Sequence, residues 1–376
     1  MANPHIPAGH HTVAPYLVVP DADALILFME RAFDAVETER AARRDGTIMH
    51  AEVRIGDSMV MLAETPTAGR PRPALAAAIE AVGFDGIWTA ETSHNPFLPL
   101  TLAAEHTQRI SLGTAIAVAF ARSPTTLAHI AWDLQRYSAG RFLLGLGTQV
   151  KAHIERRFGM AWDSPSARLR EMILGMRALW NCWQNGARLN FRGEYYKLTL
   201  MSPFFNPGPI EHPRIPIYIA GVNKGLCQLA GELCEGFHVH PFHTVKYLQE
   251  VTLPNIGIGL VRSGRQRSDI SLSSSVFVIT GQDAEALTAS RQAVRSQIAF
   301  YASTPSYHSV MEVHGWLETA EKLGMLAARQ QWQEMASLIT DDMLEIFAVS
   351  GAPDDLAAQI QQRLSLIHIS EPTRPY

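Results

Sequence analysis

Polar side chains gather where an apolar segment of the sequence ends. The stretch GFDGIWTA is followed by ETSHNP, which places Glu91 and His94 directly after a segment that reads as a buried strand. Histidine has an unperturbed pKa near neutrality, so it can donate a proton or hold an aromatic ring at physiological pH. In a parallel barrel the carboxyl ends of the strands form the functional rim. We therefore predict Glu91 and His94 as catalytic residues, with a capped solvent loop as the alternative.

The next apolar segment, ISLGTAIAVAFARSP, ends in small residues. Small side chains let a flat ring approach the backbone, so residues 115–119 are predicted to supply a packing wall rather than catalysis. A plain buried strand would also account for these residues. Arg122, which follows, is expected either to contact an acidic group or to be solvated.

Two glycine-containing segments each follow a predicted strand. Gly145 and Gly147 have the spacing of a dinucleotide fingerprint, but Val150 stands where the third glycine belongs, so the pattern is weak. Glycines at a barrel strand end instead fit a loop whose backbone N–H groups face a cofactor. The segment GVNKG runs from strand to helix, and free N–H groups there, together with Lys224, would bind a phosphate. A β-α turn without a ligand is the alternative.

Three histidines lie close together in the segment GFHVHPFHT. His238 and His240 fall on one face of a predicted strand, and His243 lies just beyond it. Imidazole is a common metal ligand, yet no carboxylate or cysteine stands at a matching spacing nearby. We therefore predict that His238 and His240 line a cofactor pocket, and we predict no metal site.

These candidate residues need a scaffold that brings their strand ends together. Residues 74–364 alternate short strands with amphipathic helices, which is typical of a parallel sheet covered by helices. Strands are expected at 86–90, 110–119, 142–147, 215–220, 236–240, 270–279 and 346–349. Helices are expected at 73–82, 125–137, 166–183, 224–234, 245–263 and 284–301. These α/β units predict a TIM-like (β/α)8 barrel with insertions.

The predicted barrel is incomplete at its ends. Its first strand should precede helix 73–82, but residues 67–73 form part of the linker-like stretch PTAGRPRP. Upstream, residues 1–66 read as a small βαβββ module of α+β type. Downstream, residues 365–376 break the pattern of the last helix, which leaves the last strand open. A chimeric or truncated reading frame is the favoured explanation, and a genuine gene fusion is the alternative.

Composition limits the classes of function. The chain has 376 residues, of which 47% are hydrophobic and 18% charged, and its net charge of −4 indicates neither nucleic acid nor an anionic membrane as a partner. The longest apolar run is too short to span a bilayer, and the N-terminus has no signal-peptide pattern. Three cysteines without CxxC spacing suit a reduced cytoplasm. A cytoplasmic protein acting on a small molecule is expected, and a homo-oligomer is left open.

Several of these segments, in order, resemble the luciferase-like monooxygenase superfamily, and within it the F420-dependent oxidoreductases. The resemblance covers residues 72–364 and rests on GFDGIWTAETSHNPF, ISLGTAIAVAFARSP, GRFLLGLGTQV, IPIYIAGVNKG and GFHVHPFHT. Residues 1–66 resemble one half module of the glyoxalase-like vicinal-oxygen-chelate family, which pairs two modules around a metal. The tail LSLIHISEPTRPY resembles a translated sequencing adapter, so residues 365–376 are interpreted as non-native.

The resemblance implies a barrel that holds a deazaflavin or a flavin. In such proteins the third strand often carries a bulge or an unusual peptide bond that packs on the ring. The implied cofactor-binding residues are Ala115, Ala117 and Val118 against the ring, Gly147, Thr148 and Gln149 beside it, Gly221, Val222, Asn223 and Lys224 around the phosphate, and His238 and His240 lining the pocket. Two positions depart from the family pattern: Gln149 or Val150 stands where some relatives have a proton-transferring glutamate, and Asn95 where they have aspartate.

The expected activity is hydride transfer between reduced coenzyme F420 and an organic substrate. An FMN-dependent luciferase-like monooxygenase is the first alternative. The second is a non-functional chimeric chain or a glyoxalase-like metal-binding module. Segments 160–213 and 304–342 are expected to form insertions over the barrel mouth. Their aromatic residues would shape a substrate pocket or pack in the core: Trp162, Phe204, Phe205, Tyr307 and Trp316.

Overall fold

The computed structural model describes residues 16–19, 22–42, 47–55, 58–64, 73–281 and 283–365. The chain forms two compact units, Met1–Arg72 and Pro73–Tyr376. Nearly all of the expected linker 67–73 and of the expected tail 365–376 lies outside the described residues. Among the helices that are described, none has the length and apolar character that crossing a bilayer demands.

The first unit has the predicted βαβββ order. Its elements are β1 (Tyr16–Val19), α1 (Ala22–Phe33), β2 (Val36–Ala42), β3 (Ile48–Ile55) and β4 (Ser58–Glu64). The sheet order is β1-β4-β3-β2, with β1 parallel to β4 and the other pairs antiparallel. Helix α1 buries Ala22, Ile26 and Met29, which share one helix face, in a core with Ile48 and Val53. The glyoxalase-like origin of this unit stays a prediction.

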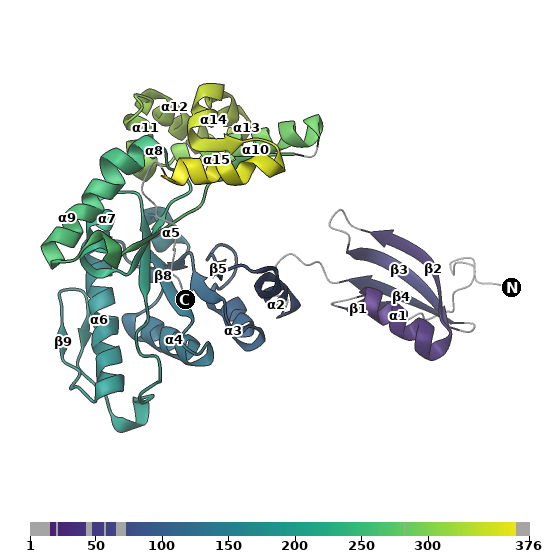
Figure 1. Ribbon diagram of the computed structural model, residues 1–376, viewed down its shortest axis with the longest axis horizontal. Helices are drawn as coiled ribbons and strands as arrows, with labels where there is room; N and C mark the ends of the chain where they lie inside the picture. Colours follow the sequence, from purple (N-terminus) through teal and green to yellow (C-terminus); the bar gives the residue numbers. More distant parts are fainter. Residues whose placement is uncertain are drawn as a thin grey trace. The chain divides into compact units, whose positions relative to one another are not determined.

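The second unit is built on a curled parallel sheet (Figure 1). Its strands are β5 (Gly86–Thr89), β6 (Ser111–Thr114), β7 (Ala117–Val118), β8 (Phe142–Gly147), β11 (Ile217–Gly221), β12 (Gly236–Val239) and β13 (Ser271–Ser274). Their order is β13-β12-β11-β8-β6-β5, and β7 also pairs with β8. A separate parallel pair consists of β14 (Phe277–Ile279) and β15 (Ala348–Ser350). The predicted TIM-like barrel is confirmed in its incomplete form, because no described strand pairs with the outer edge of β5.

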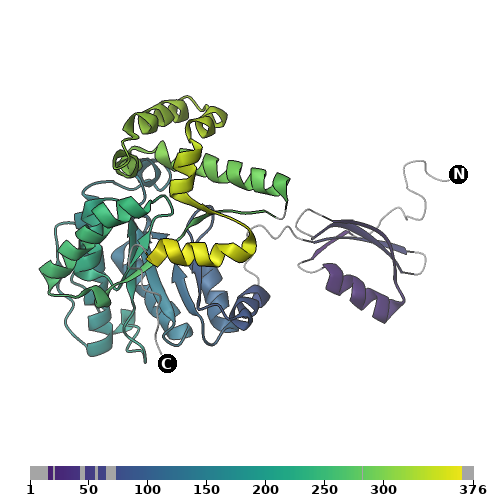
Figure 2. The same cartoon turned by 45° about the horizontal axis from the view of Figure 1, so that its top comes forward.

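Helices cover this sheet and extend its connections. The α/β repeat contains α2 (Pro73–Val82), α3 (Phe97–His106), α4 (Pro124–Tyr137), α5 (Lys151–Arg156), α6 (Pro165–Asn185), α7 (Lys224–Leu233), α8 (Val245–Tyr247), α9 (Leu253–Ser263) and α15 (Pro353–Ser365). A second group contains α10 (Ala284–Ala302), α11 (His308–Glu312), α12 (Leu317–Ala328), α13 (Trp332–Met335) and α14 (Asp341–Phe347). This group stands beside the sheet in both views (Figure 1, Figure 2) and has its own core around Ile298 and Phe347.

Helix α4 illustrates how the sequence sets an element boundary. Ser123 is its N-cap, and Ser123 Oγ accepts a hydrogen bond from Thr126 N at 3.1 Å. Pro124 takes the first helical position, where a backbone N–H would have no partner within the helix. The buried positions Leu127, Ala131 and Leu134 recur every three or four residues and face the sheet core. This helix fixes the segment that follows β7.

Some predicted elements are divided differently in the structure. The strand expected at 110–119 consists of β6 and β7, with a cis peptide bond between Ala115 and Ile116 at the division. The strand expected at 270–279 consists of β13 and β14, which belong to different sheets. The helix expected at 245–263 contains a π-helical turn, Leu248–Thr252, between α8 and α9. Helix α3 was not predicted, because prolines at 96 and 99 obscure its start.

The two long insertions belong to different parts of the second unit. Segment 304–342 belongs to the α10–α14 group, whereas the segment after α6 carries the hairpin of β9 (Phe191–Arg192) and β10 (Lys197–Leu198). Figure 1 shows β9 alongside α6, and the turn of the hairpin is bound to the first half of that helix, where Glu171 accepts hydrogen bonds from Glu194 N and Tyr195 N. Phe204 and Phe205 follow this hairpin and are 88% and 66% exposed. They therefore do not pack in the core, which was one of the two expectations for them.

Candidate active site

Two adjoining cavities open at the carboxyl ends of the strands in the second unit. The helix-side cavity has a volume of 390 Å³ and is bordered by the starts of α5, α6 and α7. The sheet-side cavity has a volume of 310 Å³ and is bordered by the ends of β5, β12 and β13. Four residues line both cavities: Ile116, Gln149, Ala220 and His240. A larger cavity of 460 Å³ lies between β15, α10 and α15, and the predicted site residues are not part of it.

Most of the predicted site residues line the two cavities. On the helix side these are Gly147, Thr148, Gln149, Gly221, Val222, Asn223 and His240. On the sheet side they are Glu91, Ala115, Gln149, His238 and His240. Ala117 and Val118 are 0% exposed and lie behind the cavity wall. Lys224 and His94 are exposed and lie outside the lining of both cavities.

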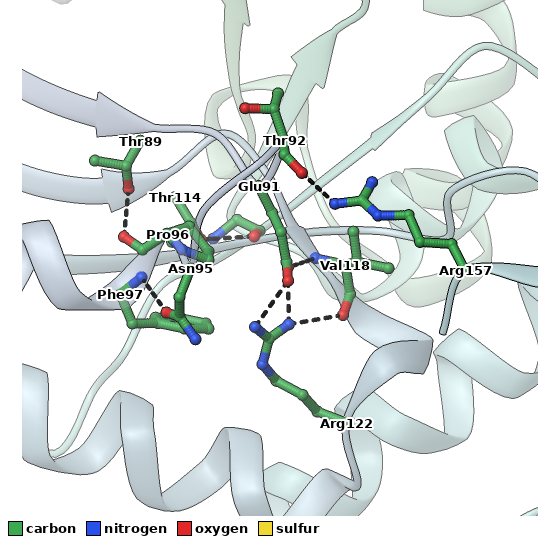
Figure 3. Close-up of polar contacts among 11 residues, drawn as sticks. Thr89, Glu91, Thr92, Asn95, Pro96, Phe97, Thr114, Val118, Arg122 and Arg157 are labelled. Carbon is green, nitrogen blue, oxygen red and sulfur yellow. Dashed lines mark hydrogen bonds and ion pairs between the residues drawn. The ribbon is translucent and has the colours of Figure 1, made fainter. Parts of the chain in front are cut away.

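Glu91 is held by a buried ion pair (Figure 3). Its Oε2 accepts from Arg122 Nη1 at 2.7 Å and from Val118 N at 2.7 Å, and its Oε1 accepts from Arg122 Nη2 at 2.9 Å. The two side chains are only 7% and 13% exposed. The backbone N–H of Glu91 donates to the carbonyl of Ile116 at 3.0 Å. The carboxylate thus fastens the chain just after the cis peptide bond, and Arg122 makes the acidic contact that the sequence left open.

The loop that carries His94 is fixed by bonds to its neighbours (Figure 3). Thr89 Oγ1 donates to the carbonyl of Pro96 at 2.8 Å, and Asn95 Oδ1 accepts from Phe97 N at 2.9 Å. The guanidinium of Arg157 donates to the carbonyl of Thr92. Of the polar side chains that follow β5, Asn95 caps the start of α3 and Glu91 pairs with Arg122, whereas Thr92 contributes its backbone carbonyl. The catalytic role of His94 stays a prediction.

Two helices begin at the helix-side cavity without a side-chain cap. Ser164 precedes α6 and Asn223 precedes α7, and neither side chain accepts a hydrogen bond from its helix, whereas the residues before α4, α10 and α14 do. The two starts are close together, since a Cβ on Gly225 would lie 2.9 Å from Ser166 Oγ. Pro165 has no N–H, so α6 can offer an anion the N–H groups of Ser166 and Ala167, and α7 can offer those of Lys224 and Gly225. Lys151, whose Nζ also lies 3.8 Å from Glu155 Oε1, belongs to the same lining.

The histidines after β11 are buried and uncharged at neutral pH. His238 is 6% exposed and packs between Trp88 and Tyr218, with ring centroids 5.1 and 5.2 Å away. Burial lowers the pKa of His238 to about 4. Burial, and then the neighbouring His243, lowers the pKa of His240 to about 4. Burial likewise lowers the pKa of His243 to about 4.

Glycines make room for the aromatic layer beneath the sheet-side cavity. A Cβ on Gly113 would lie 2.0 Å from the Trp88 ring, and a Cβ on Gly145 would lie 1.7 Å from the carbonyl oxygen of Thr114. Larger residues at either position would force β5, β6 or β8 apart. Gly145 therefore has a packing function, which the sequence pattern alone did not reveal.

Ser306 is a lining residue that the sequence did not reveal, whereas Gln149, Trp162 and Tyr307 were predicted. Ser306 Oγ is buried at the helix-side cavity and has no hydrogen-bond partner among the described residues. Gln149 adopts a left-handed backbone conformation with φ 62°, which is uncommon for a residue other than glycine. Trp162 and Tyr307, two of the predicted pocket aromatics, line the helix-side cavity. Trp316 instead stacks on His314 with ring centroids 4.5 Å apart.

The model of the luciferase-like monooxygenase family matches residues 58–367. The chain belongs to this family. Luciferase-like proteins are oxidoreductases and monooxygenases, so membership supports an enzymatic function of that kind. An uncharacterized protein of Mycobacterium tuberculosis is 49% identical over 288 residues, which are 77% of this chain and 85% of the relative. A 5,10-methylenetetrahydromethanopterin reductase of Archaeoglobus fulgidus is 31% identical over 291 residues, which are 75% of this chain and 82% of the relative.

Solved structures of the luciferase-like family have the same fold. The coenzyme F420-dependent tetrahydromethanopterin reductase from Methanopyrus kandleri superimposes with a TM-score of 0.63 at 24% identity, covering 78% of this chain and 87% of its own. The oxygenating constituent of 3,6-diketocamphane monooxygenase from Pseudomonas putida, solved with FMN, gives a TM-score of 0.54 at 17% identity, covering 78% and 83%. At these identities the likeness establishes the fold alone.

Proposed function

We propose that this protein is an F420-dependent oxidoreductase of the luciferase-like class, which acts on a small organic substrate. The observation that carries the proposal is the pair of uncapped helix starts, α6 and α7, beside Lys151 at the helix-side cavity. The F420-dependent reductase of the same fold and the 31% identical methanopterin reductase support this choice of cofactor.

The residues present fit a planar ring with an anionic arm. The free N–H groups of α6 and α7 and the ammonium of Lys151 suit the phosphate of the arm. Ser306 Oγ, buried without a partner, offers a further hydrogen bond to the arm or to the ring's polar edge. The backbone of Ala115 and Gly147 presents small residues to the two cavities, which leaves a flat wall for a ring.

The protein's own groups bind and orient the reactants. When bound, F420 supplies a hydride acceptor or donor. Glu91 acts as a positioning residue, because its carboxylate holds Val118 N and Arg122 and so fixes the wall formed by residues 115–118. Gln149, with its left-handed backbone, sets the turn between the two cavities. His94 at the exposed rim is the proposed group for proton exchange with solvent.

Titration of the purified full-length protein with F420, followed by fluorescence quenching, tests the proposal. We expect saturable binding that Lys151→Gln weakens by about tenfold, equivalent to about 1.4 kcal/mol. Lys224→Gln is the matched comparison, because Lys224 also stands near a helix start but lies outside the cavity lining, and it should weaken binding much less. Failure to bind either F420 or FMN would contradict the proposal and favour a non-functional composite chain.

An FMN-dependent monooxygenase is the second candidate. The observation that favours it is the FMN-containing structure of the same fold, since FMN also combines a flat ring with a phosphate. F420 carries a longer acidic tail, so its affinity should fall more steeply with salt than that of FMN. Tighter binding of FMN than of F420 in parallel titrations would transfer the assignment to the monooxygenase.

A further inference from the structure

His240 stands at the junction of the two cavities, just after the carboxyl end of β12. Its side chain lines both the helix-side and the sheet-side cavity. The backbone N–H of Phe242 donates to His240 Nδ1 at 3.1 Å. A ring nitrogen that accepts a hydrogen bond carries no proton, so the neutral imidazole must bear its proton on Nε2. The backbone thereby assigns the tautomer and makes Nε2–H the donor of the ring.

Two tyrosines hold the imidazole ring in place. The Tyr307 ring lies 4.6 Å from the His240 ring at 36°, and the Tyr301 ring meets it edge-on at 4.8 Å and 88°. Tyr301 lines the sheet-side cavity and Tyr307 the helix-side cavity. The carbonyl of His240 also contacts His243 Nδ1 at 2.8 Å. A ring held by two aromatic neighbours and at Nδ1 is a preorganised donor, which orients a ligand with little loss of entropy on binding.

Charge divides the two cavities. Among the described residues that line the sheet-side cavity, Glu91 is the only aspartate, glutamate, lysine or arginine. Its negative charge is neutralised by Arg122. Lowered pKa values keep His238 and His240 neutral near pH 7. A carboxylate or phosphate placed here would lose its hydration without gaining a counterion, which is costly. The cationic features, Lys151 and the starts of α6 and α7, all belong to the helix-side cavity.

We propose that the sheet-side cavity binds an uncharged organic substrate through a carbonyl or hydroxyl oxygen, which accepts a hydrogen bond from His240 Nε2–H. The substrate class follows from the donor and from the absence of an uncommitted charge among the described lining residues. The inference rests on the proposed function, in which the anionic arm of the cofactor takes the helix-side cavity and its ring lies against the wall at Ala115 and Gly147, which leaves the remainder of the sheet-side cavity to the substrate. It adds the chemical class of the substrate and the residue that orients it.

The test uses the full-length protein, with cyclohexanone as the uncharged probe and cyclohexanecarboxylate as its charged counterpart. Saturation-transfer NMR measures probe binding without any cofactor. In protein labelled with 15N-histidine, long-range 1H–15N spectra report the tautomer of His240. We expect an unprotonated Nδ1, a protonated Nε2 whose resonance moves on addition of cyclohexanone, and at least tenfold weaker binding of the carboxylate. Loss of the signal in His240→Gln assigns it.

Variants separate the inference from the proposed function. His240→Phe keeps a ring but removes the donor, and should weaken cyclohexanone about tenfold while F420 affinity changes less than twofold. His240→Gln places an amide donor near the position of Nε2 and should recover most of the affinity. His106→Phe is the control, because His106 is exposed at the end of α3.

Each outcome supports or overturns either the inference or the proposed function. Equal binding of ketone and carboxylate overturns the inference, as does unchanged ketone binding in His240→Phe or an Nδ1-protonated ring. Equal weakening of F420 and ketone in His240→Phe also overturns it, because His240 would then contact the cofactor. A further outcome is that the protein binds cyclohexanone as expected, with the expected losses in the variants, and yet does not bind F420. That result would contradict the proposed function but support the oxygen-binding site at His240.

Discussion

At the scale of single residues, Glu91 was predicted to be catalytic, and the structure shows its carboxylate holding the backbone at Val118 in place. Its carboxylate accepts three hydrogen bonds, two from Arg122 and one from Val118 N. Arg122 lies 31 positions further along the chain, so no local pattern marks the pair. Sequence reasoning identified the polar run after β5 but could not see its partner, because the ion pair exists only when β5 and β7 end at the same rim.

Glu91→Gln tests this positioning role. The amide keeps the shape but removes the charge, and leaves the Arg122 guanidinium buried without a counterion. We expect a loss of stability of about 3 kcal/mol in urea unfolding at pH 7. Glu318→Gln is the control, because the Glu318–Lys322 pair is exposed and its removal should leave the unfolding midpoint unchanged. An equally small effect at Glu91 would mean that the ion pair contributes little.

The buried histidines make stability depend on pH. The folded-state pKa of His238, His240 and His243 is about 4 for each, below the ordinary value of about 6.5. Between these values the unfolded chain binds more protons than the folded one. Their contribution is therefore complete above about pH 6.5 and is lost as the pH falls towards 4, by about 2 kcal/mol per histidine at pH 5.

Urea unfolding at pH 7.5, 6 and 5 measures this dependence. His238→Gln removes one of the three groups and should reduce the slope of unfolding free energy against pH by about 1.2 kcal/mol per pH unit between about pH 6 and 5, and by less above about pH 6. The slope is the informative quantity, because the substitution also removes packing against Trp88 and Tyr218. An unchanged slope would show that His238 titrates normally in the folded protein.

At the scale of elements, the sequence predicted the regular α/β repeat better than its interruptions. Helix α2 has the predicted bounds, Pro73–Val82, because an alanine-rich segment begins with proline and ends at a glycine. The division at Ala115–Ile116 lies within a uniformly apolar run, so hydrophobicity gives no sign of it. Simple alternation would place Ala115 and Ala117 on the same side, yet Ala115 lines a cavity whereas Ala117 and Val118 are fully buried.

The position of α7, one of the helices that start at the helix-side cavity, depends on close packing between α7 and α9. A Cβ on Gly259 would lie 2.0 Å from the carbonyl oxygen of Gln228, and a Cβ on Gly231 would lie 2.1 Å from that of Ile256. Such distances require glycine on both helices, because backbone atoms cannot move aside as a side chain can. The position of Asn223 at the start of α7 therefore depends on this packing.

Gly259→Ala should separate the two helices. We expect a loss of stability of about 1–3 kcal/mol and weaker binding of F420, since the start of α7 moves. Gly257→Ala is the matched control in the same helix, because nothing lies within 4 Å of its added Cβ. It should be neutral or stabilising by up to about 1 kcal/mol. Thermal unfolding and F420 titration of both variants check the result, and equal behaviour of the two would contradict the packing argument.

At the scale of the whole molecule, the chain has separate hydrophobic cores. Ala22, Ile26, Met29 and their neighbours form the core of the first unit, and the second unit has two larger clusters of its own. All tryptophans of the sequence fall in residues 73–376. Tryptophan emission therefore reports on the second unit, while far-ultraviolet circular dichroism reports on both.

We expect the two units to unfold in separate transitions. In a urea titration the circular dichroism curve should contain an additional, earlier step that tryptophan emission does not follow, because the smaller unit buries less apolar surface. A point substitution in the first core, such as Ile26→Ala, should move only that step. Coincident curves for both probes would show that the chain unfolds as one cooperative unit.

Among the described strands none pairs with the outer edge of β5, and this has a consequence for handling the protein. The carbonyls of Asp85 and Thr89 accept bonds from β6, so by alternation the peptide groups of Gly86 and Trp88 turn towards the outer side. An unpaired edge strand of this kind can form backbone hydrogen bonds with a strand of another molecule. We therefore expect concentrated samples to aggregate well below the temperature of unfolding. Lowering the protein concentration, rather than the temperature, should keep the sample monodisperse.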